Sequence, residues 1–65
     1  MVTAYEAYEL YEDEVKAYRQ YSAFAKLALT RKLASMWRRM ANDERRHANL
    51  IARNLLHVHA KKAMV

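Results

Sequence analysis

The chain has 65 residues, enough for one small domain, and it contains no glycine, proline or cysteine. The absence of cysteine excludes disulfides, thiol redox centres and cysteine-ligated zinc. Glycine and proline are the main residues of turns, so their absence predicts helix almost throughout an all-α chain. The formal charge of +5 is uneven, because all twelve Lys and Arg residues follow an acidic stretch at residues 1–14. Helix dipoles account for this asymmetry most simply, and a basic surface that binds nucleic acid is the alternative.

A chain of this length rarely buries enough apolar surface alone, and small domains usually add a metal, disulfides or a partner chain. Disulfides are excluded here, so we expect a metal, a partner chain or both. No apolar run approaches the roughly 18 residues of a membrane span. The N-terminus is acidic and so differs from a signal peptide. We therefore expect a cytoplasmic protein with no membrane partner.

The first predicted helix covers residues 3–28 of a single domain, residues 1–65. One side of this helix repeats at the alternating three- and four-residue spacing of a packed helix face, which we name its seam. Glu14 is the ionisable residue on this seam. The seam positions are Thr3, Ala7, Leu10, Glu14, Ala17, Tyr21, Phe24 and Ala28.

A turn at about residues 29–31 and a second helix over about residues 31–62 are predicted next. Thr30 is the predicted N-cap, because a threonine hydroxyl can accept a hydrogen bond from the first turn of a helix. Glu44 and His47 are the ionisable residues on the second seam. The positions of that seam are Leu33, Trp37, Met40, Glu44, His47, Ile51, Leu55 and Val58.

An antiparallel hairpin is favoured over one unbroken helix by the places of two carboxylates. Residue 29 is the midpoint between Glu14 and Glu44. A turn there brings both carboxylates to the same height on facing helices, whereas one continuous helix would hold them about 45 Å apart. The hairpin therefore gathers the ionisable seam residues at one level.

Glu14, Glu44 and His47 form a predicted metal site. Glu44 and His47 are three residues apart and so share a helix face. Burying a lone carboxylate is costly unless it is paired or bound to a metal. Two paired hairpins would offer four Glu and two His inside a four-helix bundle, the ligand set of di-iron carboxylate bundles. Four carboxylates would balance the charge of two divalent ions.

Two stretches resemble the rubrerythrin-type ferritin-like family. In "EVKAYRQYSAFAKLA", Glu14 is followed by Ala17, Tyr21, Ala25 and Ala28, as in the first half of that family's motif. In "MANDERRHANLI", Glu-x-x-His is followed by Ala, as in the second half. The resemblance covers about residues 14–55. Family members carry both halves on one chain and this chain has one, so the resemblance requires a homodimer that forms a ferritin-like four-helix bundle.

The resemblance implies a role for each site residue. Glu14 would be a terminal ligand of one metal, Glu44 would bridge two metals, and His47 would be a terminal nitrogen ligand. Tyr21, the candidate catalytic residue, would donate a hydrogen bond to a ligand carboxylate; its alternative is a core aromatic with its hydroxyl at the edge. Asp43 resembles the aspartate that orients a ligand histidine in designed di-iron bundles.

The function implied is that of a di-iron oxidoreductase. Two Fe ions per dimer are expected, with Mn or a mixed Fe/Mn pair as alternatives, because oxygen-rich ligands with one imidazole suit these metals. The substrate would be hydrogen peroxide or dioxygen, in a peroxidase or ferroxidase reaction. The chain has no cysteine-rich electron-transfer domain, so another molecule would donate electrons.

Two other functions stay open. One is a metal-storage assembly, in which the same site forms between chains of a larger ring. The other is a non-catalytic basic helical module that binds nucleic acid or a partner helix. That module leaves Glu14, Glu44 and His47 without a role, so nucleic acid is the less favoured partner.

Overall fold

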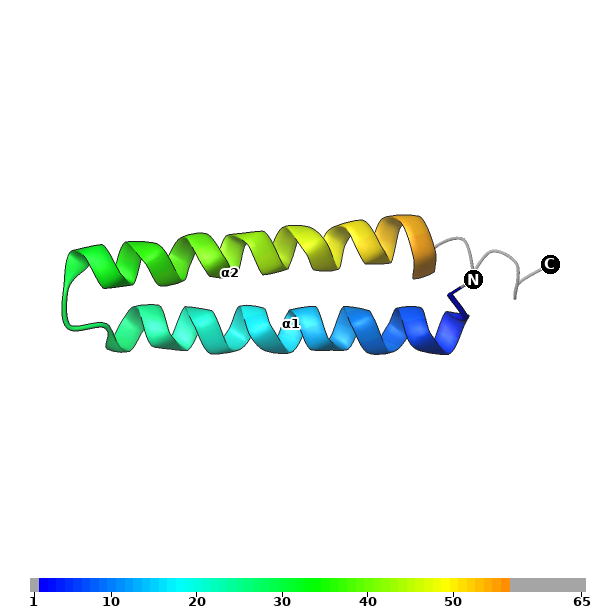
Figure 1. Cartoon of the computed structure of the whole chain (residues 1–65), viewed down its shortest axis with the longest axis horizontal. Helices are drawn as coiled ribbons and strands as arrows, with labels where there is room; N and C mark the ends of the chain where they lie inside the picture. Colours follow the sequence, from blue (N-terminus) through cyan, green and yellow to red (C-terminus); the bar gives the residue numbers. More distant parts are fainter. Residues whose placement is uncertain (1, 57–65) are drawn as a thin grey trace.

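The computed structural model describes residues 2–56, which form two α-helices and a short continuation of the second. Helix α1 spans Ala4–Leu27, α2 spans Arg31–Ile51, and the π-helical turn η1 spans Ala52–Leu56. The two long helices run side by side in opposite directions (Figure 1). The all-α fold expected from the sequence is confirmed. Of the second helix predicted over residues 31–62, residues 57–62 lie outside the described part.

Two threonines start the two helices. The Thr30 hydroxyl oxygen accepts a hydrogen bond from the Leu33 N–H at 3.1 Å, which confirms the predicted N-cap. Thr3 does the same for α1, accepting from the Glu6 N–H at 3.1 Å. Each cap satisfies an N–H that the first turn of a helix leaves without a partner.

The connection between the helices needs no glycine. The C-cap residue of α1, Ala28, and the N-cap of α2, Thr30, both have extended backbone angles (φ −65°, ψ 137° and φ −131°, ψ 156°). Among the described residues none has a positive φ. Since extended angles are open to every residue type, the chain reverses here without the residues that usually mark a turn.

Alanines make the contact between the helices. The buried apolar residues among those described are all alanines: Ala7, Ala25, Ala34, Ala41 and Ala48. The three on α2 are seven residues apart and therefore lie along one side of that helix. Small side chains let the two helix backbones approach closely.

The large seam residues lie beside this contact and not within it. Leu10, Phe24, Leu33 and Met40 keep 37–45% of their surface exposed. On α2, three seam residues directly precede the buried alanines and so lie about 100° away from them around the helix. They are Leu33, Met40 and His47. We name the exposed side formed by the two seams the open face.

Aromatic packing joins the two helices across the open face. The Trp37 ring of α2 stacks on Tyr21 at a centroid distance of 5.6 Å and meets Phe24 edge-on at 4.9 Å. These contacts fix one end of the face, near the turn. No helix of the described residues has both the length and the apolar composition needed to cross a membrane.

Candidate metal centre

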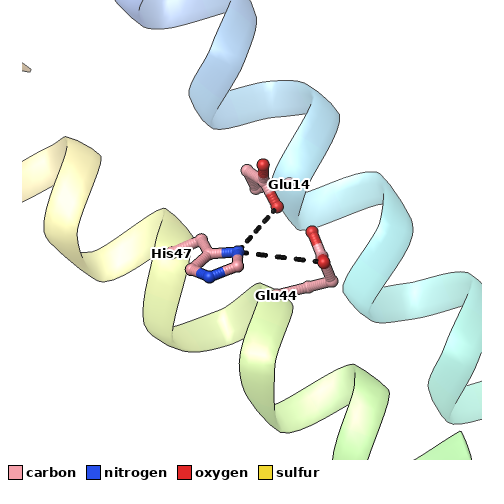
Figure 2. Close-up of side chains that lie close together, drawn as sticks. All are labelled: Glu14, Glu44 and His47. Carbon is pink, nitrogen blue, oxygen red and sulfur yellow. Dashed lines mark ion pairs between the residues drawn. The ribbon is translucent and has the colours of Figure 1, made fainter.

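The three predicted ligands meet at one level of the hairpin. Glu14 extends from α1, and Glu44 and His47 extend from adjacent turns of α2 toward it (Figure 2). The turn at residues 28–30 produces this register, because it lies halfway between the two glutamates. Among residues 2–56 this is the one group of three His, Cys, Asp or Glu side chains close enough to share an ion.

The distances between the donor atoms suit a shared ion. The Nδ1 atom of His47 lies 3.7 Å from Glu14 Oε2 and 3.8 Å from Glu44 Oε1. One donor atom from each residue lies within 4.8 Å of the others. Two ligands held about 2.1 Å from one ion are separated by roughly 3–4 Å, depending on the angle between them. A small inward movement of these side chains would therefore complete three metal–ligand bonds.

Glu14 carries a polar atom that the hairpin leaves without a partner. Its Oε2 is buried and has no hydrogen-bond partner, although the side chain as a whole is 26% exposed. A buried acceptor of this kind costs free energy, and more when it is charged. A cation beside it would remove that cost. This atom is also the one nearest His47, so the unpartnered oxygen belongs to the ligand group itself.

Exposure differs among the three side chains. Glu44 is 23% exposed, much like Glu14, whereas His47 is 47% exposed. The carboxylates thus lie deeper between the helices and the imidazole lies toward the open face. An ion bound there would have protein on one side and, on the open face, room for further ligands.

The donor chemistry fits a divalent ion of intermediate hardness. Two carboxylates carry two negative charges, which a divalent cation balances. Oxygen donors with one imidazole suit Fe, Mn or Zn, whereas soft ions prefer the sulfur ligands that this chain lacks at the site. The residues present therefore fit the iron or manganese that the sequence resemblance implies.

Tyr21 lies on the open face, seven residues after Glu14 and so about 10 Å further along α1. Its ring stacks on Trp37. Within one hairpin this placement makes Tyr21 part of the aromatic cluster. Its predicted hydrogen bond to a ligand carboxylate would therefore have to reach a second hairpin, and it stays a prediction.

Asp43 lies beside the site on the exposed side of α2. Its Oδ1 accepts a hydrogen bond from Arg46 Nη2 at 3.4 Å, and both side chains are more than half exposed. This pairing could not be predicted from the sequence, since Arg46 is one of several arginines near Asp43. The predicted contact of Asp43 with a ligand histidine stays a prediction.

Comparison of this chain with models of known protein families, with curated proteins and with solved structures found no match. The resemblance to the rubrerythrin-type family thus stays a prediction carried by the residues of the two motifs. The geometry of Glu14, Glu44 and His47 is independent of that resemblance.

Proposed function

We propose that this protein is a di-metal carboxylate protein of the rubrerythrin and ferritin type, with its metal site shared across a homodimer. The observation that carries the proposal is the convergence of Glu14, Glu44 and His47, with the buried Glu14 oxygen left unpartnered. Three ligand-type side chains from two helices meet there, where packing alone would favour apolar ones.

The open face supports pairing of two hairpins. It combines large, partly exposed apolar side chains with the three candidate ligands, and its hairpin buries little besides alanine among residues 2–56. A two-fold axis through the open face, at the level of the ligands, would bring a second ligand set opposite the first. The result would be four Glu and two His around two ions in a four-helix bundle.

Each residue has a distinct proposed task. Glu44 would hold an ion from the middle of the bundle, and Glu14 would bind the ion from the other helix. His47 Nδ1 supplies the nitrogen ligand. Tyr21 and Asp43 would act across the dimer, the first on a ligand carboxylate and the second on a ligand histidine.

The proposed reaction is reduction of hydrogen peroxide or dioxygen. Iron bound at this site would supply the electrons, and an external donor would restore them. The open face between the hairpins is apolar apart from the ligands, so it would exclude bulk water and admit a small oxidant. The protein's own contribution is thus to fix the spacing of the ions and to keep their surroundings dry.

Substitution of the ligands tests this function. We expect Glu44→Ala and His47→Ala each to abolish stoichiometric binding of two ions per dimer in an anaerobic Fe(II) or Mn(II) titration. The matched control is Glu12→Ala, which removes an exposed carboxylate of α1 outside the site and should bind as the wild type does.

Two results would count against the proposal. Retention of both ions by Glu44→Ala or His47→Ala would show that the ligands are misassigned. Iron-loaded wild-type protein that consumes neither peroxide nor dioxygen would leave a metal-binding protein without the proposed reaction. A mass well above that of a dimer would favour the metal-storage assembly.

A further inference from the structure

A second surface lies on α2, away from the candidate metal centre. It consists of exposed basic residues, which we name the basic stripe: Arg31, Lys32, Arg38, Arg39, Arg45, Arg46 and Arg53. Of the ten Lys and Arg residues between positions 2 and 56, these are seven, so the positive charge is concentrated on one helix and its continuation. Arg46 pairs with Asp43, and none of the seven belongs to the candidate metal site.

Helix periodicity arranges the stripe in two rows. Arg31, Arg38 and Arg45 are seven residues apart, as are Lys32, Arg39, Arg46 and Arg53. Seven residues make nearly two helical turns, so each row runs along α2 and not around it. From end to end the stripe extends roughly 30 Å at about 1.5 Å per residue.

The stripe and the metal centre occupy different sides of α2. Ala34, Ala41 and Ala48 are buried against α1, and Glu44 and His47 lie next to them on the open face. The stripe residues are all exposed. Pairing of two hairpins through the open face would therefore leave the stripe accessible. One chain can therefore carry both a basic surface and a metal site, which the sequence analysis treated as alternatives.

We infer that the basic stripe binds the phosphate backbone of double-stranded nucleic acid. Its length is close to one turn of a B-DNA duplex, about 34 Å. Exposed arginines in rows can neutralise successive phosphates, which is the main source of affinity for nucleic acid. Asn42 and Asn49 lie between the two rows. They line a shallow depression together with Asp43, Arg45, Arg46, Leu50 and Arg53. Their amides can donate further hydrogen bonds to phosphate oxygens.

The residues beside the arginines favour a duplex over other polyanionic partners. A membrane-surface helix needs several apolar side chains flanking its basic ones. Ser35, Asn42 and Asn49 are polar, and Leu50 is the one large apolar side chain that lines the depression. Binding of single strands relies on aromatic side chains that stack on bases. The stripe contains none, and the Tyr21–Trp37 pair belongs to the open face.

A second copy of this chain fits the stripe less well. The exposed acidic residues of α1 are Glu6, Glu9, Glu12 and Asp13. They span seven residue steps, roughly 10 Å of helix, against roughly 30 Å for the stripe. Their charges would leave most of the stripe without a counterpart.

The test is a triple substitution of one row, Arg39→Gln, Arg46→Gln and Arg53→Gln, in the full chain. The probe is a fluorescein-labelled DNA duplex of about 24 base pairs, two helical turns, followed by fluorescence anisotropy at several KCl concentrations. We expect the Kd to rise at least about tenfold. The slope of log K against log salt should fall by up to about 2.7, since each phosphate contact contributes about 0.9.

A matched triple on α1 controls for net charge: Lys16→Gln, Arg19→Gln and Lys26→Gln. These residues are exposed on α1, and the substitution removes the same three charges. Lys26 is the one that shares a depression with the stripe residues Arg31 and Arg38. We expect its Kd to change by no more than about threefold. Unchanged helical circular dichroism and metal binding by both triples would show that the fold is intact. Lysine in place of the three arginines should restore binding, because phosphate neutralisation needs only the charge.

Several outcomes would overturn the inference. They are wild-type protein that does not bind the duplex at low salt, equal losses in the α1 and α2 triples, and binding to phosphatidylserine vesicles without binding to DNA. A fourth is a change in oligomeric mass as the sole effect of the α2 triple, which would assign the stripe to contacts between copies. None of these outcomes depends on whether the metal site is correctly assigned.

Discussion

At the scale of a single residue, Glu14 is the member of the candidate site that carries an unsatisfied polar atom. Its buried Oε2 has no hydrogen-bond partner and lies 3.7 Å from His47 Nδ1. If the site binds a metal as proposed, its buried carboxylate is destabilising without the metal and stabilising with it.

Replacing Glu14 by leucine separates these two effects. Glu14→Leu should raise the stability of chelator-treated protein by about 1 kcal/mol, because an unsatisfied buried acceptor is removed. The same variant should lose stoichiometric metal binding. Urea unfolding of the metal-free protein and a metal titration measure the two quantities.

The control for this variant is Glu12→Leu, at an exposed position two residues earlier. Its stability should change by no more than about 0.5 kcal/mol, as is usual for surface positions. Metal-free Glu14→Leu that unfolds at lower urea than the wild type would contradict the burial of this carboxylate.

The convergence of Glu14, Glu44 and His47 could be predicted from the sequence, and the contacts around them could not. Glu14, Glu44 and His47 interrupt apolar seams, and that pattern is visible without coordinates. The pairing of Asp43 with Arg46 depends on rotamers of long exposed side chains, which helix periodicity does not determine.

At the scale of the helices, alanine sets the distance between α1 and α2 and so the geometry of the site. Ala41 is 3% exposed, lies on the side of α2 that meets α1, and is three residues before Glu44. A larger side chain there has no space to occupy. The separation of Glu14 from the two ligands of α2 thus depends on a residue that binds nothing.

Ala41→Leu tests this dependence. Overpacking a tight contact typically costs about 1–3 kcal/mol, so the variant should unfold at lower urea. It should also bind metal more weakly, because α1 and Glu14 are displaced from His47. Urea unfolding and a metal titration are again the measurements, with Ala23→Leu, an exposed position of α1, as the control.

Wild-type stability together with wild-type metal affinity in Ala41→Leu would show that the alanine contact does not set the site. A loss of the same size in Ala23→Leu would point to a general effect of leucine on the helices.

The turn and the core of the hairpin differ in how well the sequence determines them. The turn was predicted because residue 29 is the midpoint between Glu14 and Glu44 and because Thr30 can cap a helix. The structure confirms the Thr30 cap. The contact through Ala41 was not predicted, because the seam read from the sequence of α2 includes Met40 and not Ala41. Hydrophobic periodicity locates the buried side of a helix only to within about one residue, or 100°. It does not show whether that side packs on the other helix of the hairpin or on a second hairpin.

At the scale of the whole molecule, the open face is the surface that lacks a partner. The large side chains of the open face are partly exposed on both helices. The buried apolar residues among positions 2–56 are all alanines. A small domain with so little apolar burial needs a further source of stability. Pairing of two hairpins and binding of metal would supply it together.

Leu33→Glu tests the role of the open face in association. Leu33 is 44% exposed on this face, and a charge placed there would be buried in the dimer without a partner. The dissociation constant of the dimer, measured by sedimentation, should rise at least about tenfold.

The control for the open face is Leu29→Glu, because Leu29 is 96% exposed in the turn. It should associate as the wild type does. Equal dissociation of both variants, or of neither, would place the contact between copies elsewhere.

The most direct measurement is native mass together with metal content, on protein purified without chelator. We expect a dimer that carries about two ions of iron or manganese, and the loss of these ions in Glu44→Ala and His47→Ala. A monomer, or a metal-free species that does not bind added Fe(II), would contradict the account. Glu14, Glu44 and His47 would then be a polar layer of the hairpin.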